Sequence, residues 1–458
     1  MFPMSPVEAL FVLLETASHP LHTAALAVFT PPADQRDGHA RRMVETLRSH
    51  TDVAELFRRR PRRLGGYPWW TCDDEVDLDY HVQHLAVPAP GTTAELLTVV
   101  AGLHEIPLDP RHPLWEVCVL EGLADGGTGV YVKVHQSLLD DRALLQLLHR
   151  SLAPHPHLHH CPAPWDPRVA PAPRSWPLRP DTALRAGLRT AAEIATLAPQ
   201  LFDTVLRDLR RRGDPVLSLR TPPTVLNVCD GRARVLAAGS WPVEKLRTVA
   251  AATGTGLDAV VVAACAGAVR SYLLDRRALP AATLTAMVPT ALELDPVIGP
   301  HGRSRGLGAR VIPLATDEPD PGLRLARIAA ALARSEQLCA AFSRTQFRIF
   351  SALALSPLVL APARRFATAI PPPFNVTISY LPGPNRPRYW NGARLSAVYP
   401  VPTVPTGQGV SITLAGNDDR LDVGIVADRH ALPEPHPLLG GLDAALADLA
   451  RAVGGDRS

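Results

Sequence analysis

The chain has 458 residues, of which 46% are hydrophobic and 20% charged, and its formal net charge is +3. This length allows two or three domains, and this composition is that of a globular protein rather than a disordered one. The small net charge gives no electrostatic reason to expect a nucleic-acid partner. The six cysteines form no C-x-x-C pair, which is typical of a reduced protein rather than a disulfide-bonded one.

The sequence predicts neither a signal peptide nor a transmembrane helix. Glu8 and Glu15 are the first charged residues, so the positive N-terminal region of a signal peptide is missing. The longest run without a polar residue or proline, 259–269, is about half of the ~18–20 residues that cross a bilayer, and we expect it to form a buried helix. We therefore expect a cytoplasmic protein, soluble or in peripheral contact with a membrane or lipid droplet.

The first hundred residues contain few chemical signals. Ser5 and Pro6 suit the cap and first turn of a helix, and residues 24–29 have the composition of a strand. The arginine-rich run 57–63 offers cations for phosphate groups or an anionic membrane, although a solvated face is the commoner outcome for such a run. We interpret His81 as a structural residue.

Two strands are predicted further along, one after residue 116 and one at 129–134. The prolines of the segment 107–113 enforce an extended path before the first of these strands. Alternating valines at 129–134 predict a half-buried strand, and leucines at helical spacing predict a helix that begins near Asp140. The turn between this strand and helix contains His135, and an imidazole at a strand end is a plausible general base. The alternative interpretation is a hydrogen-bonded polar residue without a catalytic role.

Residues 154–180 are rich in proline and histidine. The segment 155–161 offers five potential metal ligands, but the prolines that follow it favour a linker with exposed histidines, and we predict no metal site. Helical spacing returns at 182–212.

The second half alternates predicted strands and helices. Asp258 opens the apolar helix described above, where it can complement the helix dipole. A strand that ends in Pro-Gly-Pro covers 374–384, and its turn chemistry suffices to explain these residues. The apolar segment 350–361 is compatible with a membrane interface or with a core helix. The remaining predictions are strands at 234–238, 284–289, 310–314, 410–414 and 421–427, and helices from 242 and over 437–453.

Several of these segments together resemble the bacterial wax ester synthase/diacylglycerol acyltransferase family. Residues 132–141 resemble its His-His-x-x-x-Asp-Gly motif, 108–116 its Leu-Asp-x-x-x-Pro-Leu-Trp-Glu segment, and 374–384 its Ser-Asn-x-Pro-Gly-Pro segment. These segments occur in the family's order, and the resemblance runs from Ser5 to about residue 451.

The motif is matched with one change at its catalytic position. His135 falls on the family's first histidine, Gln136 falls on the second, which is the family's general base, and Asp140 matches the aspartate. Asp141 stands where the family has glycine. A glutamine can form hydrogen bonds but cannot accept a proton at neutral pH. If strand geometry persists into the turn, His135 and Gln136 point in opposite directions, so His135 is a poor replacement for the base.

The resemblance implies an α/β fold, more closely an α+β two-layer fold, of two chloramphenicol-acetyltransferase-like halves with a substrate channel between them. The halves are expected at 1–153 and 221–458, joined by a proline-rich linker and helix at 154–220. The resemblance assigns catalysis to His135, Gln136 and Asp140. The residues that it assigns to substrate binding are Pro113, Leu114, Trp115, Asp258, Ser379, Pro382 and Gly383.

Two functional hypotheses follow from the resemblance. In the first, the protein transfers a long-chain acyl group from acyl-CoA to diacylglycerol or to a long-chain alcohol without a cofactor, and it is either slow or uses His135 in an altered turn. In the second, it is a non-catalytic relative that binds acyl-CoA or neutral lipid. A peptide-synthetase condensation domain is disfavoured, because the Pro-Leu-Trp-Glu and Pro-Gly-Pro segments point to the lipid family.

Overall fold

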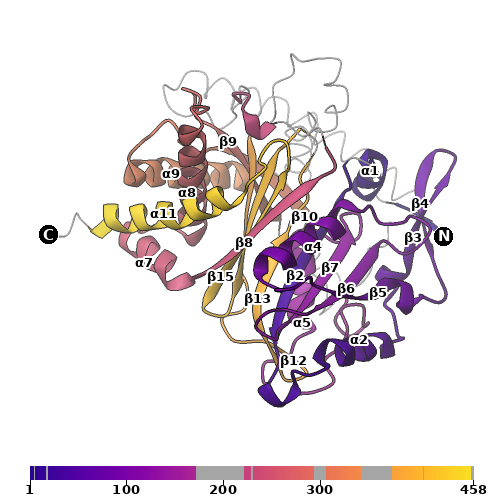
Figure 1. Ribbon diagram of the computed structural model, residues 1–458. Helices are drawn as coiled ribbons and strands as arrows, with labels where there is room; N and C mark the ends of the chain where they lie inside the picture. The colour runs from indigo at the N-terminus through magenta and orange to yellow at the C-terminus, as the bar shows by residue number, and fades with distance from the viewer. Residues whose placement is uncertain are drawn as a thin grey trace.

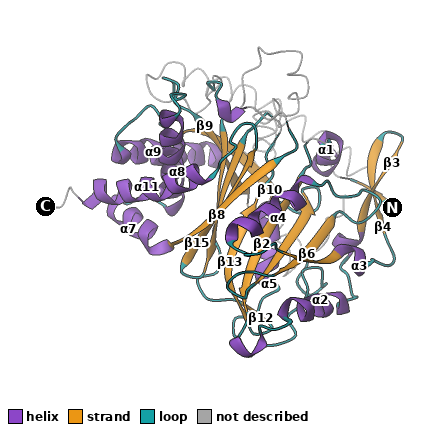
Figure 2. Cartoon of the chain, viewed as in Figure 1, coloured by secondary structure: helices purple, strands orange, loops and turns teal. Residues whose placement is uncertain are grey.

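The structure, a computed structural model, describes residues 1–4, 6–16, 19–171, 221–227, 231–292, 306–341, 374–405 and 407–454. Within these ranges the chain forms two six-stranded mixed sheets and a three-stranded sheet, with helices packed against the two large sheets (Figures 1 and 2). The predicted α/β class with two sheet-containing halves is confirmed.

The first large sheet contains the strand that leads to His135. Its strand order is β12-β13-β2-β7-β6-β5, and only the pair β5–β6 is parallel. In that order the strands are Tyr389–Trp390, Ala393–Val401, His22–Thr30, Thr128–His135, Trp115–Glu121 and Val82–Ala86.

The prediction of a half-buried strand at 129–134 is wrong in one respect, because every residue of β7 is buried. Val130, Val132 and Val134 pack with helices α2 (His39–Ser49) and α5 (Asp141–Arg150). Tyr131, on the opposite face, packs with helix α4 (Thr93–Glu105) and with residues of the second sheet. The alternation in the sequence therefore reflects two different buried environments rather than a buried and a solvated face.

A small sheet and two short helices cover the end of the first half. This sheet has the order β1-β4-β3 and contacts helix α1. The four elements are Phe2–Pro3, Tyr67–Cys72, Arg59–Leu64 and Pro6–Leu14, and helix α3 is Leu78–His81.

The arginine-rich run is not one continuous cationic surface. Arg59 is 2% exposed, forms an ion pair with Glu55 at 2.8 Å and lies over the Phe2 ring. Arg62 and Arg63 are exposed on strand β3. The solvated interpretation therefore applies to only part of the run, because β3 is buried at Arg59 and becomes exposed toward its other end.

The second large sheet has the order β10-β9-β11-β14-β15-β8, with β11 parallel to both of its neighbours. Helices α7, α8, α9 and α11 pack together against one face of it (Figure 1). In the order given, the strands are Gly306–Pro313, Thr285–Leu292, Val376–Leu381, Val410–Asn417, Arg420–Asp428 and Arg234–Pro242. The helices are Val243–Thr253, Leu257–Asp275, Pro321–Ala341 and His436–Gly454.

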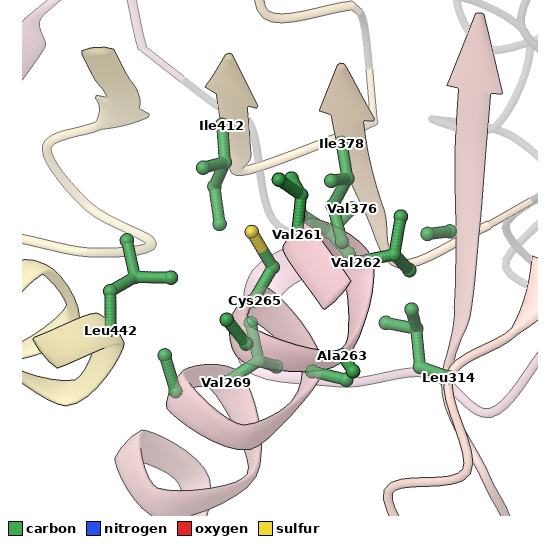
Figure 3. Close-up of a cluster of buried hydrophobic side chains, with 14 of the residues drawn as sticks. Val261, Val262, Ala263, Cys265, Val269, Leu314, Val376, Ile378, Ile412 and Leu442 are labelled. Carbon is green, nitrogen blue, oxygen red and sulfur yellow. The ribbon is translucent and has the colours of Figure 1, made fainter. Parts of the chain in front are cut away.

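Helix α8 is the centre of the second half. Figure 3 shows Val261 and Cys265 facing Ile378 of β11 and Ile412 of β14, with Leu442 of α11 on another side. The helix is long and apolar enough to cross a membrane, but 72% of its apolar window is buried inside the protein. This burial agrees with the predicted core helix.

The second half supplies two strands to the first sheet. Strand β13 pairs with β2, and it also contacts β14 and β15. The Asp422 carboxylate on β15 accepts the Val398 N–H of β13 at 2.7 Å, and a Cβ on Gly424 would lie 1.7 Å from the Pro400 carbonyl oxygen. The boundaries at 153 and 221 stay a prediction, but the first sheet also takes in residues 389–401 of the predicted second half.

The histidine-rich segment is an exposed turn region with one buried end. Its histidines are exposed, whereas Cys161 is buried and its N–H donates to Asn391 Oδ1 at 2.9 Å. In the described ranges, no group of three or more His, Cys, Asp or Glu residues could hold a metal ion. The predicted helix at 182–212, the apolar segment 350–361 and Ser5 lie outside the described residues.

Candidate active site

The end of β7 is held on both sides by neighbouring strands. His135 is paired with His22 of β2, and its N–H donates to the Leu114 carbonyl at 3.0 Å. The following N–H, of Gln136, donates to the Leu21 carbonyl at 2.9 Å, and the His135 carbonyl accepts from Leu138 at 2.9 Å. The motif turn is therefore fixed by backbone bonds before any side chain is considered.

The His135 side chain is completely buried and lies between a serine and a glutamate. Its Nδ1 accepts the Ser137 N–H at 3.1 Å and lies 2.6 Å from Ser137 Oγ. Its Nε2 lies 3.5 Å from Glu15 Oε2, which is an ion-pair distance. Because Nδ1 accepts a backbone N–H, a neutral ring carries its proton on Nε2, toward Glu15.

Glu15 is itself anchored. Its Oε1 accepts the Leu21 N–H at 3.0 Å, and this bond leaves Oε2 directed at His135. Burial raises the pKa of Glu15, but the attraction of His135 and the Leu21 hydrogen bond outweigh this effect, so the pKa lies below its ordinary value. Glu15 is therefore a carboxylate that is held beside the imidazole and orients its ring.

Gln136 points to a different part of the molecule. Its Nε2 donates to Thr403 Oγ1 at 2.8 Å, and Thr403 Oγ1 donates to the His22 carbonyl at 2.5 Å. Thr403 follows β13, so Gln136 lies where a segment of the second half meets the motif turn. The prediction that His135 and Gln136 face in different directions is confirmed. The imidazole of His135 thus does not replace a base at position 136.

The two aspartates of the motif act at the start of α5. Asp140 is the N-cap residue, and its Oδ1 accepts the Ala143 N–H at 2.8 Å. Asp141 accepts a hydrogen bond from the Thr23 hydroxyl of β2. Burial, and to a smaller extent Asp140, raises the pKa of Asp141 to about 6 although the Thr23 bond opposes this shift. Asp140 therefore caps α5, and Asp141 links the start of α5 to β2.

The Pro-Leu-Trp segment supports the turn from beneath. Pro113, Leu114 and Trp115 are buried, and Leu114 supplies the carbonyl that accepts the His135 N–H. The Trp115 Nε1–H donates to the Phe57 carbonyl at 2.8 Å, and His81 stacks on the Trp115 ring. His81 also bonds the Trp115 carbonyl through Nδ1 at 2.8 Å, as expected of a structural residue. The assigned role in substrate binding stays a prediction.

The predicted residues of the second half form a separate group. Asp258 lies in the first turn of α8 without capping it, because the N-cap is Gly256. Burial raises the pKa of Tyr380, and the nearby Asp258 carboxylate adds to this effect against Arg247. Ser379 is buried in β11, whereas Pro382 and Gly383 are exposed in the turn after it. The assigned residues therefore divide between the two halves, and the channel between the halves stays a prediction.

Gly383 has a structural requirement of its own. A Cβ at this position would lie 1.6 Å from the Gly416 carbonyl oxygen of β14. The turn therefore needs glycine for the close approach of two backbones.

A layer of buried polar residues lies behind the motif on the α4 side of the sheet. Lys133 Nζ lies 2.8 Å from Glu116 Oε2 and donates to the carbonyls of Leu103 and Ile106. His22 Nε2 donates to the His104 carbonyl at 2.7 Å, and His104 Nδ1 bonds the Tyr131 hydroxyl at 2.9 Å. Burial lowers the pKa of His104 to about 3, so this histidine is neutral at pH 7.

A small apolar cavity of about 40 Å³ lies in the first half, between the sheet and helices α2 and α5. Phe29, Met43 and Leu148 are among its lining residues, and His135 is not. The cavity is therefore separate from the motif turn and is not the predicted channel.

Sequence reasoning missed Glu15 and Thr403 as partners of the motif turn. They lie 120 positions before His135 and 267 positions after Gln136, and no local pattern marks either residue. Ser137 had a local signal, because a serine two residues after a histidine in a turn is close enough to reach the ring.

Comparisons with known proteins show the family of this chain. The model of the wax ester synthase/diacylglycerol acyltransferase catalytic domain matches residues 4–261, and that of the family's C-terminal domain matches residues 306–450. A probable diacylglycerol O-acyltransferase of Mycobacterium tuberculosis is 35% identical over 455 residues, which cover 98% of this chain and 99% of that protein. The chain therefore belongs to the wax ester synthase/diacylglycerol acyltransferase family.

Solved structures give the same result for the fold. The wax ester synthase/diacylglycerol acyltransferase from Marinobacter aquaeolei VT8 has a TM-score of 0.75 and 31% identity, with 99% of this chain and 100% of that chain covered. The first condensation domain of the calcium-dependent antibiotic synthetase has a TM-score of 0.60 at 15% identity and covers 100% of this chain and 97% of that chain. The second similarity shows the fold alone.

Proposed function

We propose that this protein is an acyl-CoA-dependent O-acyltransferase of neutral-lipid synthesis. It transfers a long-chain acyl group to diacylglycerol, which gives triacylglycerol, or to a long-chain alcohol, which gives a wax ester. Diacylglycerol is favoured because the Mycobacterium tuberculosis relative described above, which matches almost the whole chain, is named for it. Acyl-CoA is a co-substrate, and the reaction requires no cofactor.

The observation that carries the proposal is the motif turn at the end of β7. The change at position 136 determines the rate that we expect. Acyl transfer to an alcohol needs a group that accepts the hydroxyl proton, and such a base contributes roughly 10²–10⁴-fold to the rate. Gln136 can orient a substrate oxygen but cannot take its proton. We therefore expect slow turnover by direct attack of the alcohol.

A non-catalytic role in binding acyl-CoA or neutral lipid is the second candidate. The Gln136 side chain favours this candidate, because it cannot accept a proton and is held in place by its hydrogen bond to Thr403. Binding of acyl-CoA without product formation supports this candidate.

The test measures triacylglycerol formation from long-chain acyl-CoA and diacylglycerol. Gln136→His restores an imidazole, and Thr403 Oγ1, which already accepts from Gln136 Nε2, can accept one ring N–H and leave the other nitrogen basic. We expect Gln136→His to raise the rate by about 10²-fold or more. Gln146→His, on the exposed side of α5, makes the same chemical change away from the turn and should have no effect.

The outcomes separate the two candidates. Product from the native protein or from Gln136→His supports the enzyme. Absence of product from both, with acyl-CoA binding retained in a calorimetric titration, refutes the acyltransferase proposal for these substrates and supports the binding protein.

Contact with a membrane or lipid droplet belongs to the same proposal. Leu10 and Leu13 of α1 are 40% and 47% exposed, and Leu64 and Tyr67 at the β3–β4 turn are 56% and 39% exposed. Helix α1 contacts β4, and α1, β3 and β4 lie together at one end of the molecule (Figure 1). Arg62 and Arg63 are exposed on β3. Co-sedimentation with anionic vesicles that is lost on Leu64→Asp would support this contact.

A further inference from the structure

The side chains of Ser137, His135 and Glu15 form a continuous line. Ser137 Oγ lies 2.6 Å from His135 Nδ1, and His135 Nε2 lies 3.5 Å from Glu15 Oε2. The backbone N–H of Ser137 also donates to Nδ1, so this nitrogen is an acceptor and the Ser137 hydroxyl points its proton at it. A hydroxyl, a ring nitrogen that accepts its proton and a carboxylate behind the ring are the parts of an activated nucleophile.

A serine in a turn often serves only to close the turn. In that case its hydroxyl bonds a nearby backbone group. Here the hydroxyl bonds a ring nitrogen instead, and the carboxylate on the far side of the ring has a separate anchor in the Leu21 N–H. Glu15 comes from the segment after α1 and not from the turn. Closing the turn requires neither Glu15 nor its anchor.

We propose that Ser137 is an acyl-accepting nucleophile, with His135 as its base and Glu15 as the residue that positions the ring. The proposal rests on the acyltransferase function proposed above and adds a covalent step to it. It provides a route for acyl transfer that does not require a base at position 136.

Acylation of Ser137 is balanced within the three residues and the thioester. Ser137 Oγ attacks the carbonyl carbon of the acyl-CoA, and its proton moves to His135 Nδ1. The bond between the carbonyl carbon and sulfur breaks, and Nδ1 passes the proton to the sulfur of the departing CoA. Glu15 stabilises the imidazolium that exists between these proton transfers.

Deacylation reverses the proton transfers with an alcohol in place of CoA. The acceptor hydroxyl gives its proton to His135 Nδ1, and its oxygen attacks the carbonyl carbon of the serine ester. The bond from this carbon to Ser137 Oγ breaks, and Nδ1 returns the proton to Oγ. The product is the ester of the acceptor, and the enzyme returns to its starting state.

Solvent exposure is lowest at His135, in the middle of the three residues, and higher at Ser137 and Glu15. His135 is 0% exposed and Ser137 is 5% exposed, whereas the Glu15 side chain is 23% exposed. The base is therefore shielded from bulk water, and its Nδ1 is reached from the side of Ser137.

The test is intact-protein and peptide mass spectrometry after mixing the full chain with long-chain acyl-CoA without an acceptor and quenching with acid. We expect a mass increase of one acyl group on the peptide that contains Ser137. Ser137→Ala should remove the adduct, and Ser137→Cys should keep it as a thioester. His135→Ala should slow its formation by roughly 10²-fold or more.

Ser151→Ala is the matched control, because Ser151 is also buried and its hydroxyl bonds a local carbonyl, that of Leu147. It should leave the adduct unchanged. No adduct on the native protein, or an adduct that persists in Ser137→Ala, overturns the proposal. Triacylglycerol formation is measured separately, so product formed by an unacylated Ser137→Ala variant would refute the covalent step and leave the acyltransferase function standing.

Discussion

The two halves of this protein use the same architecture for different purposes. Each has a six-stranded mixed sheet with helices packed against it, but they place their buried charges differently. The first half buries an ion pair behind the motif strand β7, whereas the buried ion pair Arg234–Asp428 of the second half joins the edge strand β8 to β15. The layer behind the motif strand contains Lys133, Glu116 and His104. By contrast, helix α8 packs Val261 and Cys265 against Ile412 of β14 (Figure 3). The helix layer of the second half meets its sheet through apolar side chains, and the polar layer of the first half lies behind the strand that carries His135.

The buried ion pair of the first half gives the largest expected effect. Lys133→Met should lower the free energy of unfolding by about 3 kcal/mol, because Glu116 is left without its cation and two backbone carbonyls lose their donor. Urea denaturation of the variant measures this loss. The double variant Lys133→Met/Glu116→Leu should recover most of it, since a buried pair can be replaced by apolar residues. A single variant as stable as the native protein would contradict this view of the polar layer.

The charge of Asp141, at the motif position where the family has glycine, is expected to lower the free energy of unfolding at neutral pH. Its folded pKa of about 6 lies above that of an unfolded aspartate, so the native state binds the proton more tightly. The stability associated with this proton is present below about pH 4 and is lost as the pH rises through about 6. Asp141→Asn keeps an acceptor for Thr23, and it should raise the free energy of unfolding by about 1–2 kcal/mol at pH 7.

The control for Asp141→Asn is the pH. At pH 4 the native aspartate is protonated, so the variant and the native protein should then have the same urea midpoint. An equal gain at both pH values would show that the effect comes from packing and not from charge.

The apolar helix layer of the second half should give the smallest effect for a conservative change. Ile412→Val removes one buried methyl group at the contact with α8, and it should cost about 0.5–1.5 kcal/mol by urea denaturation. Leu323→Ala, at a side chain that is 58% exposed, should change the stability by less than about 0.5 kcal/mol. If Ile412→Val costs more than Lys133→Met, the contrast between the two halves is wrong.

The sequence by itself determined the elements and the family. The alternation at 129–134, the apolar run at 259–269 and the Pro-Gly-Pro turn each give a local signal, because strands, helices and turns constrain neighbouring residues. The change at Gln136 was also visible in the sequence, since the motif defines its position.

Only the tertiary structure decided which faces are buried and which groups meet. The face of β7 that carries Tyr131 is buried because α4 and the second half cover it. The alternation of residues in one strand cannot predict which other elements will pack on it. The partner of His135 is Glu15 and that of Gln136 is Thr403, and both partners are far away in the sequence. Only the folded chain brings them together. Side-chain chemistry depends on such distant contacts, whereas secondary structure depends mainly on near ones, and this difference is why the chemistry of the motif turn could not be predicted from the sequence alone.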